Sequence, residues 1–298
     1  MQKGAQYQAV WELISEIFKD KIPADNIINA YVRERKYIGS KDRRFITETV
    51  WKIIRNRRKL VFDAGLDEPR RVLLTYLQDE DFDLLCGGEY GLAPLSKEEK
   101  EWLKRRNEEV YPAAVEAECP DWLFDKVKDI HLLKALNEPA SADLRLNKGS
   151  RARVIEQLQG EGLYFVPTPY SPIGIRSAER VNLNNCVAYK EGVIEVQDEA
   201  SQLAAILADV RPEHKIIDYC CGAGGKSLTM AFLMNRQGKI QIHDINRSRL
   251  EAVKERAVRL DVKNLEIIDE VRDRDYDRFV VDAPCSGTGT WRRSPDAN

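Results

Sequence analysis

The residues of this 298-residue chain with the clearest chemical capacity form the segment Asp282-Ala-Pro-Cys285, which follows the apolar run at 279–281. A thiolate is a strong nucleophile once its pKa is lowered from about 8.5. Methylation of cytosine needs one, because C5 becomes nucleophilic only after a thiolate has added at C6, and a base then removes the C5 proton. A nearby aspartate can hold the cytosine edge. Cys285 and Asp282 are therefore candidate catalytic residues.

A glycine-rich turn, DYCCGAGGKS, predicts a cofactor site. Its glycines allow a tight turn and close approach of a ligand, and the helix expected to begin near Lys226 points its amides at that ligand. Asp244 follows the next predicted strand, about twenty residues on, where a carboxylate can accept both ribose hydroxyls. Asp269 follows a third strand, where it can meet the adenine end. This pattern predicts a nucleoside cofactor such as S-adenosylmethionine.

The same turn leaves a nucleoside triphosphate as a second possible ligand. Gly225, Lys226 and Ser227 match the end of the phosphate-loop pattern G-x-x-x-x-G-K-[ST], but Cys220 stands where its first glycine belongs. Carboxylates at the ends of successive strands would also repel a bare polyphosphate. The nucleoside cofactor is the favoured interpretation.

Apolar strands that alternate with amphipathic helices place these residues. The pattern from 196 onward predicts parallel βαβ units, with strands at 215–219, 238–244, 264–268 and 277–283 and helices near 198–209, 226–236 and 246–260. The chain before it divides into a helical part and a module of short strands with one helix. We expect helices at 69–78, 97–110 and 121–136 after a helical first sixty residues. The predicted domains are 1–136, all-α; 137–195, small α+β; and 196–298, α/β Rossmann-like.

The net charge of −2 conceals an uneven distribution. Residues 1–60 hold 14 Lys and Arg against 7 Asp and Glu, whereas 61–121 hold 7 against 16. This basic cluster predicts a polyanionic partner, although a solvated helix face is the competing interpretation. Arg292 and Arg293 could bind phosphates, and Trp291 could stack on a base or pack in a core. The candidate residues for binding this polyanion, which would be RNA if the family resemblance described below holds, are Arg33, Arg35, Lys36, Arg43, Arg44, Arg55, Arg57, Arg58, Arg292 and Arg293.

Composition narrows the remaining function classes. No apolar run is long enough to cross a bilayer and the start lacks a signal-peptide pattern, so we expect a cytoplasmic protein without a membrane partner. The six cysteines form no C-x-x-C pair and the three histidines are scattered, which predicts neither a bound metal nor a disulfide framework.

Four segments together resemble the RsmB/Sun (NOP-type) family of S-adenosylmethionine-dependent RNA (cytosine-5) methyltransferases: VQDEASQLAA, DYCCGAGGKS, IHDIN and VVDAPCSGTGTWRRSPD. GSKDRRFITETVWKIIR resembles the NusB-like RNA-binding domain of bacterial members. The resemblance implies a class I methyltransferase domain, 16S ribosomal RNA as substrate and a monomer when complete. It implies that Asp282 contacts both the target base and the cofactor. The short segment IIDEVRDRDYDRF also offers Glu270 and Asp273 as alternatives to Asp269 near the adenine. The implied cofactor-binding residues are Cys220, Cys221, Gly222, Ala223, Gly224, Gly225, Lys226, Asp244, Asp269 and Asp282.

The chain departs from the family pattern at the nucleophile. In the family, the attacking cysteine belongs to a later Thr-Cys motif and the Pro-Cys thiol helps release the product, yet these 298 residues contain no Thr-Cys pair. We therefore expect a fragment with an incomplete sheet, a bare apolar fourth strand and little activity alone. The alternatives are a non-catalytic RNA-binding and cofactor-binding remnant, and an enzyme that uses Cys285 itself as nucleophile.

Overall fold

The computed structural model describes residues 1–19, 22–105, 107, 109–178, 181–272 and 274–297. The chain forms two compact units, which are described separately. The helical unit comprises Met1–Pro139 and Ser286–Asn298, and the cofactor unit comprises Ala140–Cys285. The three-domain division at 136 and 195 stays a prediction.

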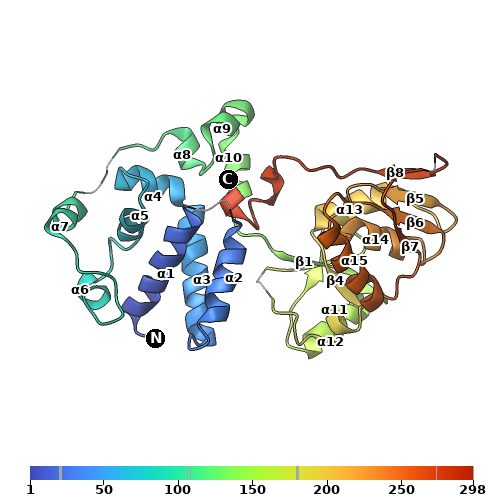
Figure 1. Ribbon diagram of the computed structural model, residues 1–298, viewed down its shortest axis with the longest axis horizontal. Coiled ribbons are helices and arrows are strands. Elements are labelled where there is room, and N and C mark those ends of the chain that lie inside the picture. Colours follow the sequence, from blue (N-terminus) through green and yellow to red (C-terminus); the bar gives the residue numbers. More distant parts are fainter. Residues whose placement is uncertain (20–21, 106, 108, 179–180, 273, 298) are drawn as a thin grey trace. The chain divides into compact units, whose positions relative to one another are not determined.

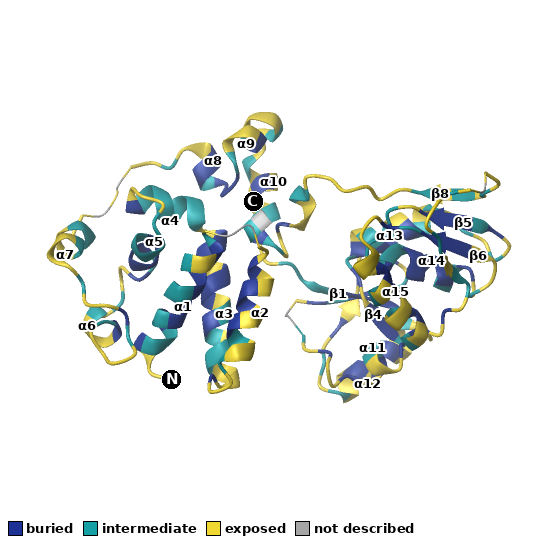
Figure 2. Ribbon diagram, viewed as in Figure 1, coloured by how far each residue is buried: buried dark blue, intermediate teal, exposed yellow. Residues whose placement is uncertain are grey.

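The helical unit is built around α1, α2 and α3, each of which has a buried and an exposed face (Figures 1 and 2). Val10, Leu13 and Ile14 of α1 are fully buried against apolar residues of α3 such as Val50 and Ile53. These positions recur at helical spacing, as the sequence predicts. The helices of this unit are α1 (Lys3–Ile17), α2 (Ala24–Glu34), α3 (Ser40–Arg55), α4 (Arg57–Ala64), α5 (Pro69–Tyr76), α6 (Phe82–Leu85), α7 (Lys97–Leu103), α8 (Ala113–Glu116), α9 (Asp121–Val127) and α10 (Ile130–Asn137).

Two predicted helices of this unit need correction. The helix expected at 97–110 ends at Leu103, although its capping box of Ser96 and Glu99 is present. The helix expected at 121–136 is two helices, because Lys128 adopts a left-handed conformation with φ of +53° and ends α9. Asp129 then caps α10 by accepting hydrogen bonds from two backbone N–H groups.

The segment after Cys285 packs within the helical unit through the 3-10 helices η1 (Thr288–Thr290) and η2 (Pro295–Ala297). Trp291 is only 2% exposed and packs against Cys119 and Leu133, so the core-packing interpretation of this residue is correct. Arg55 is also buried, and its guanidinium donates to the carbonyl oxygens of Asn137 at 2.7 Å and Arg292 at 2.6 Å. Arg55 therefore stabilises the helical unit, in contrast to its predicted RNA contact.

The first half of the cofactor unit is an antiparallel sheet of order β2-β3-β1-β4. Leu144 and Leu146 of β1 and Ile175 of β3 pack with Val154 and Leu158 of α11 in one core. This arrangement agrees with the predicted α+β module. Its elements are β1 (Ala142–Leu146), α11 (Arg151–Gly160), β2 (Val166–Pro167), β3 (Gly174–Ser177), α12 (Val187–Lys190) and β4 (Ile194–Val196).

The second half is a parallel sheet of order β7-β6-β5-β8, which agrees with the predicted βαβ units. One face packs its alternate residues, including Ile216, Ile240 and Ile242, against α14 and α15 (Figure 1). The edge strand β8 leaves Phe279 54% exposed. The elements are α13 (Glu199–Leu207), β5 (Lys215–Asp218), α14 (Gly225–Leu233), β6 (Lys239–Ile242), α15 (Arg247–Arg259), β7 (Leu265–Ile267) and β8 (Arg278–Val280).

Candidate cofactor and catalytic site

Asp244 fixes the glycine-rich turn of the cofactor unit. It lies two residues beyond β6, is 8% exposed, and accepts hydrogen bonds from the backbone N–H groups of Gly222 and Asn246, both at 2.8 Å. Cys221 N–H donates to the carbonyl of His243 at 3.0 Å, which joins the turn to the same strand end. A carboxylate has about four acceptor positions, so Asp244 can hold the turn and still accept hydroxyl groups.

The two central glycines of the turn serve different purposes. Gly224 has φ of +77°, and a Cβ there would lie 2.8 Å from Val253 of α15, so this position allows α14 to pack closely. Gly222 has φ of +57°, but a Cβ there would meet nothing within 4 Å. Gly222 therefore leaves open space beside the turn, on the backbone that Asp244 holds.

Asp218 is a buried carboxylate at this site that the sequence analysis did not identify. It ends β5, is 1% exposed, and accepts a hydrogen bond from the hydroxyl of Ser227 at 2.6 Å. Burial raises the pKa of Asp218, and its Oδ1 has no hydrogen-bond partner among the described residues. Its strand-end position was the available signal, since Asp244 was recognised by the same criterion.

Gln197 is a second residue that sequence reasoning missed, although it belongs to the segment VQDEASQLAA. It is 6% exposed, and its Oε1 accepts a hydrogen bond from Thr229 of α14 at 2.7 Å. Its Nε2 has no hydrogen-bond partner in the described part of the chain. The amide lies beside the turn, because a Cβ on Gly225 would be 3.7 Å from this Nε2.

The structure brings Asp282 to the turn. Lys226, in the first turn of α14, forms an ion pair with Asp282 at 2.5 Å, and the Asp282 side chain is 61% exposed. The predicted strand 277–283 ends at Val280, so Asp282 and Cys285 both lie in the chain that follows β8. Cys285 is exposed, whereas burial raises the pKa of the Cys221 thiol to about 12 and keeps it protonated.

The candidates for the adenine end of the cofactor lie beyond β7. Asp269 forms an ion pair with Arg247, the first residue of α15, at 2.8 Å, and both side chains are more than 70% exposed. Glu270 pairs instead with Arg272 at 3.3 Å. Asp273 lies outside the described residues. Asp269 thus remains the candidate whose ion pair connects it to the helix that follows Asp244.

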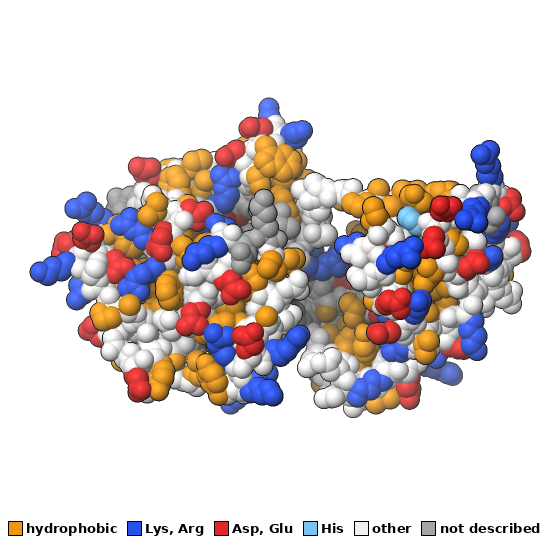
Figure 3. Space-filling model, viewed as in Figure 1, with side chains coloured by type: hydrophobic (Ala, Val, Ile, Leu, Met, Phe, Trp, Pro, Cys, Tyr) orange, Lys and Arg blue, Asp and Glu red, His pale blue; other side chains and the backbone are white. Residues whose placement is uncertain are grey.

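The predicted RNA-binding residues differ in accessibility. Arg33, Lys36, Arg44, Arg292 and Arg293 are exposed, whereas Arg35, Arg43, Arg57 and Arg58 are half-buried and Arg55 is buried. Arg58 pairs with Asp121 at 2.9 Å, and Arg57 pairs with Asp67 at 2.8 Å. Figure 3 shows Lys and Arg side chains at the end of α2 and the start of α3, with carboxylates between them.

Within the described residues, no group of three or more His, Cys, Asp or Glu side chains is placed to hold a metal ion. No helix in this part of the chain is both long and apolar enough to cross a membrane.

A parallel sheet with a glycine-rich turn after its first strand and a carboxylate after its second defines the class of nucleoside-cofactor-binding α/β domains. Residues 204–298 match the family model described as 16S rRNA methyltransferase RsmB/F. Matching relatives include the probable ribosomal RNA small subunit methyltransferase B of Bacillus subtilis and the ribosomal RNA small subunit methyltransferase B of Pseudomonas syringae. They are 28% and 30% identical over 200 and 204 residues, which cover 61% and 65% of this chain. The chain is therefore similar to RsmB-type rRNA methyltransferases, and its residues 204–298 match their family model.

Coverage differs among these proteins. The matches span 44% and 42% of the Bacillus and Pseudomonas relatives. A probable ribosomal RNA small subunit methyltransferase B of Synechocystis is 29% identical over 308 residues, which cover 86% of this chain and 69% of that protein. Among solved structures, PH0851 is 19% identical with a TM-score of 0.72, covering all of this chain and 78% of that one. NSun6 of Pyrococcus horikoshii with SFG is 18% identical with a TM-score of 0.51, covering 56% and 71%. At these low sequence identities, the two solved structures show similarity of fold alone.

Proposed function

We propose that this chain carries the S-adenosylmethionine site and part of the catalytic site of an enzyme that methylates C5 of cytosine in 16S ribosomal RNA. The observation that carries the proposal is the double hydrogen bond of Asp244, which ties the glycine-rich turn to the end of β6. The similarity to the 16S rRNA methyltransferase RsmB/F model and to the Bacillus subtilis relative supports an RNA methyltransferase.

The residues present fit S-adenosylmethionine. The space beside Gly222 accommodates a ligand close to the backbone, and Asp244 can accept its ribose hydroxyls. Three carboxylates, Asp218, Asp244 and Asp282, lie around a turn whose cation Lys226 is already paired. Such a site favours a cationic cofactor over a polyphosphate. S-adenosylmethionine would supply an electrophilic methyl group on a positively charged sulfur.

We assign separate roles to the polar groups around the turn. The N-terminal amides of α14 and the free Nε2 of Gln197 would hold the carboxylate of the cofactor's methionine part. Asp282, oriented by its ion pair with Lys226, would accept a hydrogen bond from the exocyclic amine of cytosine. Because Lys226 occupies one carboxylate oxygen, Asp282 can present the other to the base.

The proposal has three versions, which differ in the role of Cys285. The family pattern makes it the thiol that assists product release, and the absence of a Thr-Cys pair from these 298 residues leads us to expect little methyl transfer by this chain alone. A second candidate function is a non-catalytic protein that binds RNA and cofactor. The exposure of Cys285 leaves it accessible as the nucleophile itself.

The first experiment measures S-adenosylmethionine binding by calorimetry and labelled methyl transfer to unmethylated 16S ribosomal RNA. The Bacillus subtilis relative serves as a positive control for transfer. We expect cofactor binding with little transfer. Absence of cofactor binding would refute the assignment of the turn, and transfer to any atom other than cytosine C5 would refute the chemistry.

A second experiment concerns the thiol. RNA containing 5-fluorocytosine traps the covalent adduct of an attacking cysteine, because the fluorine cannot be removed as the C5 proton is. We expect no adduct with this chain. An adduct that persists in Cys86→Ser, the matched control in the helical unit, and disappears in Cys285→Ser would make Cys285 the nucleophile.

A further inference from the structure

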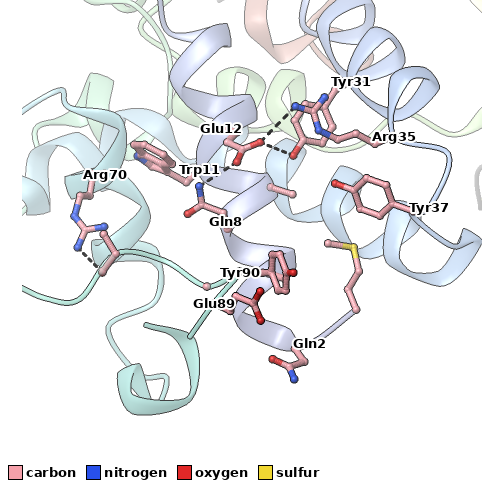
Figure 4. Close-up of a pocket in the computed structure, with 15 residues that line it drawn as sticks. Gln2, Gln8, Trp11, Glu12, Tyr31, Arg35, Tyr37, Arg70, Glu89 and Tyr90 are labelled. Carbon is pink, nitrogen blue, oxygen red and sulfur yellow. Dashed lines mark hydrogen bonds and ion pairs between the residues drawn. The ribbon is translucent and has the colours of Figure 1, made fainter. Parts of the chain in front are cut away.

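A groove of about 940 Å³ lies beside α1 in the helical unit (Figure 4). Its walls come from one face of α1 with the two residues before it, the end of α2 with the loop that follows it, the loop at 89–93, and Arg70 of α5. None of the residues proposed above for cofactor binding or catalysis lines it. Cavities of this size usually accept small ligands or parts of larger ones.

The back of the groove is a fixed polar cluster centred on Glu12. Its carboxylate accepts hydrogen bonds from the hydroxyl of Tyr31 at 2.7 Å and from Gln8 Nε2 at 3.0 Å. Arg35 lies 3.7 Å from the same carboxylate, with its guanidinium 3.7 Å from the centre of the Tyr31 ring. Figure 4 shows these four side chains together at one end of the groove. They form a polar surface with both donors and acceptors, which these contacts order before any ligand binds.

Two exposed tyrosines stand at the groove. Tyr37, from the loop between α2 and α3, is 73% exposed, and Tyr90, from the loop at 89–93, is 67% exposed. Each ring thus offers a large apolar surface to solvent beside the groove. Figure 4 shows that they come from separate segments beside α1.

The loop that carries Tyr90 is held against α1 by close backbone contacts. Leu92 N–H donates to the carbonyl of Leu85 at 3.0 Å, and Gly87 N–H donates to the carbonyl of Leu92 at 2.9 Å. A Cβ on Gly4 of α1 would lie 2.9 Å from the same Leu85 oxygen, so only glycine allows this approach. The wall is therefore formed in the free protein.

The next residues of that wall are tied to α5. Arg70 donates to the carbonyl of Ala93 at 3.0 Å and pairs with Glu99 at 2.6 Å, and each of the paired side chains is 19% exposed. This ion pair, screened from solvent by its burial, fixes the chain on the far side of Tyr90.

The charges around the groove indicate which ligand groups can bind at its edge and which can bind inside it. Residues 33–44 carry six cations and two carboxylates, and Arg33, Lys36, Lys41 and Arg44 are exposed. This segment attracts phosphates. Inside the groove, the carboxylates of Glu12 and Glu89 are balanced by Arg35 and Arg70, and carboxylate oxygens accept hydrogen bonds from amino groups. A ligand with neutral aromatic parts joined by anionic linkers matches both surfaces.

We propose that the groove binds an unstacked base of single-stranded RNA between Tyr37 and Tyr90, while the cations of 33–44 hold the adjacent phosphates. Glu12 would accept a hydrogen bond from the exocyclic amine of that base, so adenine and cytosine would be preferred over uracil. The inference rests on the proposed RNA-directed function and extends it by assigning a base-recognition site in the helical unit.

The test measures fluorescence anisotropy of short unstructured oligocytidine, oligouridine and abasic RNAs with the full chain. Tyr37→Ala and Tyr90→Ala should each weaken oligocytidine binding roughly fivefold to a hundredfold, because a stacking surface is lost. Tyr164→Ala is the matched control, since Tyr164 is 72% exposed and lies in the cofactor unit. The control and Tyr37→Phe should retain wild-type affinity, and thermal unfolding of every variant should match wild type.

Several outcomes would overturn the inference. Unchanged oligocytidine affinity in both alanine variants would show that the groove does not bind bases, and would leave a protein partner as its ligand class. Equal losses on abasic RNA would have the same meaning, because no base is then present to stack. If the wild-type chain bound no RNA at all, the proposed function would fail together with the groove. Normal RNA binding with insensitive tyrosines would refute the groove alone.

Discussion

Asp244 is the residue on which the proposed cofactor site depends most directly. Its two oxygens accept hydrogen bonds from Gly222 and Asn246, so the side chain both shapes the turn and faces the space beside it. We expect Asp244→Ala to reduce S-adenosylmethionine affinity roughly fivefold to 150-fold, since losing such hydrogen bonds costs about 1–3 kcal/mol. Calorimetric titration checks this, with exposed Asp261→Ala as the control. Wild-type affinity in Asp244→Ala would remove Asp244 from the site.

Sequence reasoning identified some residues of the candidate site and missed others for a physical reason. Asp244, Lys226 and Asp282 stand at positions that strand ends and glycine spacing define, so pattern alone located them. Gln197 lies in an earlier part of the chain, and only the packing of α13 on α14 brings it beside Gly225. Trp291 and Arg55 show the opposite case, because residues chosen for their chemistry are buried in the helical unit.

At the scale of elements, two glycines in the turn between β5 and α14 allow an effect on helix packing to be measured separately from an effect on cofactor binding. Gly224→Ala places a methyl group against Val253 in a left-handed conformation, so we expect a loss of roughly 1–3 kcal/mol in unfolding free energy. Gly222→Ala carries the conformational cost without a clash, and its methyl group enters the open space beside the turn. We therefore expect Gly222→Ala to be less destabilising but to weaken S-adenosylmethionine binding.

Urea unfolding and cofactor titration of the same two variants distinguish these effects. Each glycine variant is the control for the other, because both have positive φ and gain one methyl group. Equal loss of stability with unchanged cofactor affinity in Gly222→Ala would mean that the ligand does not approach this backbone.

A buried carboxylate at the start of α4 should make the stability of the folded chain depend on pH. Glu118 is 6% exposed and accepts hydrogen bonds from the N–H groups of Arg58 at 2.9 Å and Lys59 at 3.1 Å. Burial, opposed by these bonds, raises the pKa of Glu118 from 4.5 to about 7. Because the folded chain holds this proton more tightly than the unfolded chain, stability falls as pH rises from 4.5 to about 7 and is then constant.

Glu118→Gln should remove this part of the pH dependence, since an amide of similar shape does not titrate. We expect the stability of wild type relative to the variant to decrease between pH 4.5 and about 7, by at most about 3 kcal/mol. Chemical unfolding at several pH values measures the difference. A difference that rises with pH over this range would show that the hydrogen bonds at the start of α4 outweigh the burial of the carboxylate.

The elements themselves were predictable where residue spacing decides them. The four parallel strands and their helices follow apolar runs and amphipathic periodicity, and the structure places each of them. The break between α9 and α10 was not predictable, because the helical pattern continues across Lys128. Leu123 and Leu133, on either side of the break, share a core with Trp291, which lies more than 150 residues later in the chain. Such long-range packing leaves no local signal.

At the scale of the whole molecule, the uneven charge determines where RNA binding should reside. The net charge is −2, so a polyanion is attracted by a local surface and not by the chain as a whole. The exposed cations Arg33, Lys36 and Arg44 lie in the basic first sixty residues, whereas Arg55 is buried and holds the carbonyl of Arg292. Substitutions of the three exposed cations can therefore be compared with substitution of the buried Arg55, which serves as their control.

RNA affinity should fall steeply with salt concentration, because phosphate contacts release counterions. Each of Arg33→Ala, Lys36→Ala and Arg44→Ala should lower the slope of log affinity against log salt by about 0.7, the value for one phosphate of a single strand. Arg55→Ala should leave that slope unchanged and lower the unfolding free energy instead, since it removes the donor to Asn137 and Arg292. Anisotropy titrations over a range of salt concentrations measure the slopes. A flat dependence in wild type would contradict the polyanion interpretation, and a reduced slope in Arg55→Ala would mean that its guanidinium leaves the buried site to contact RNA.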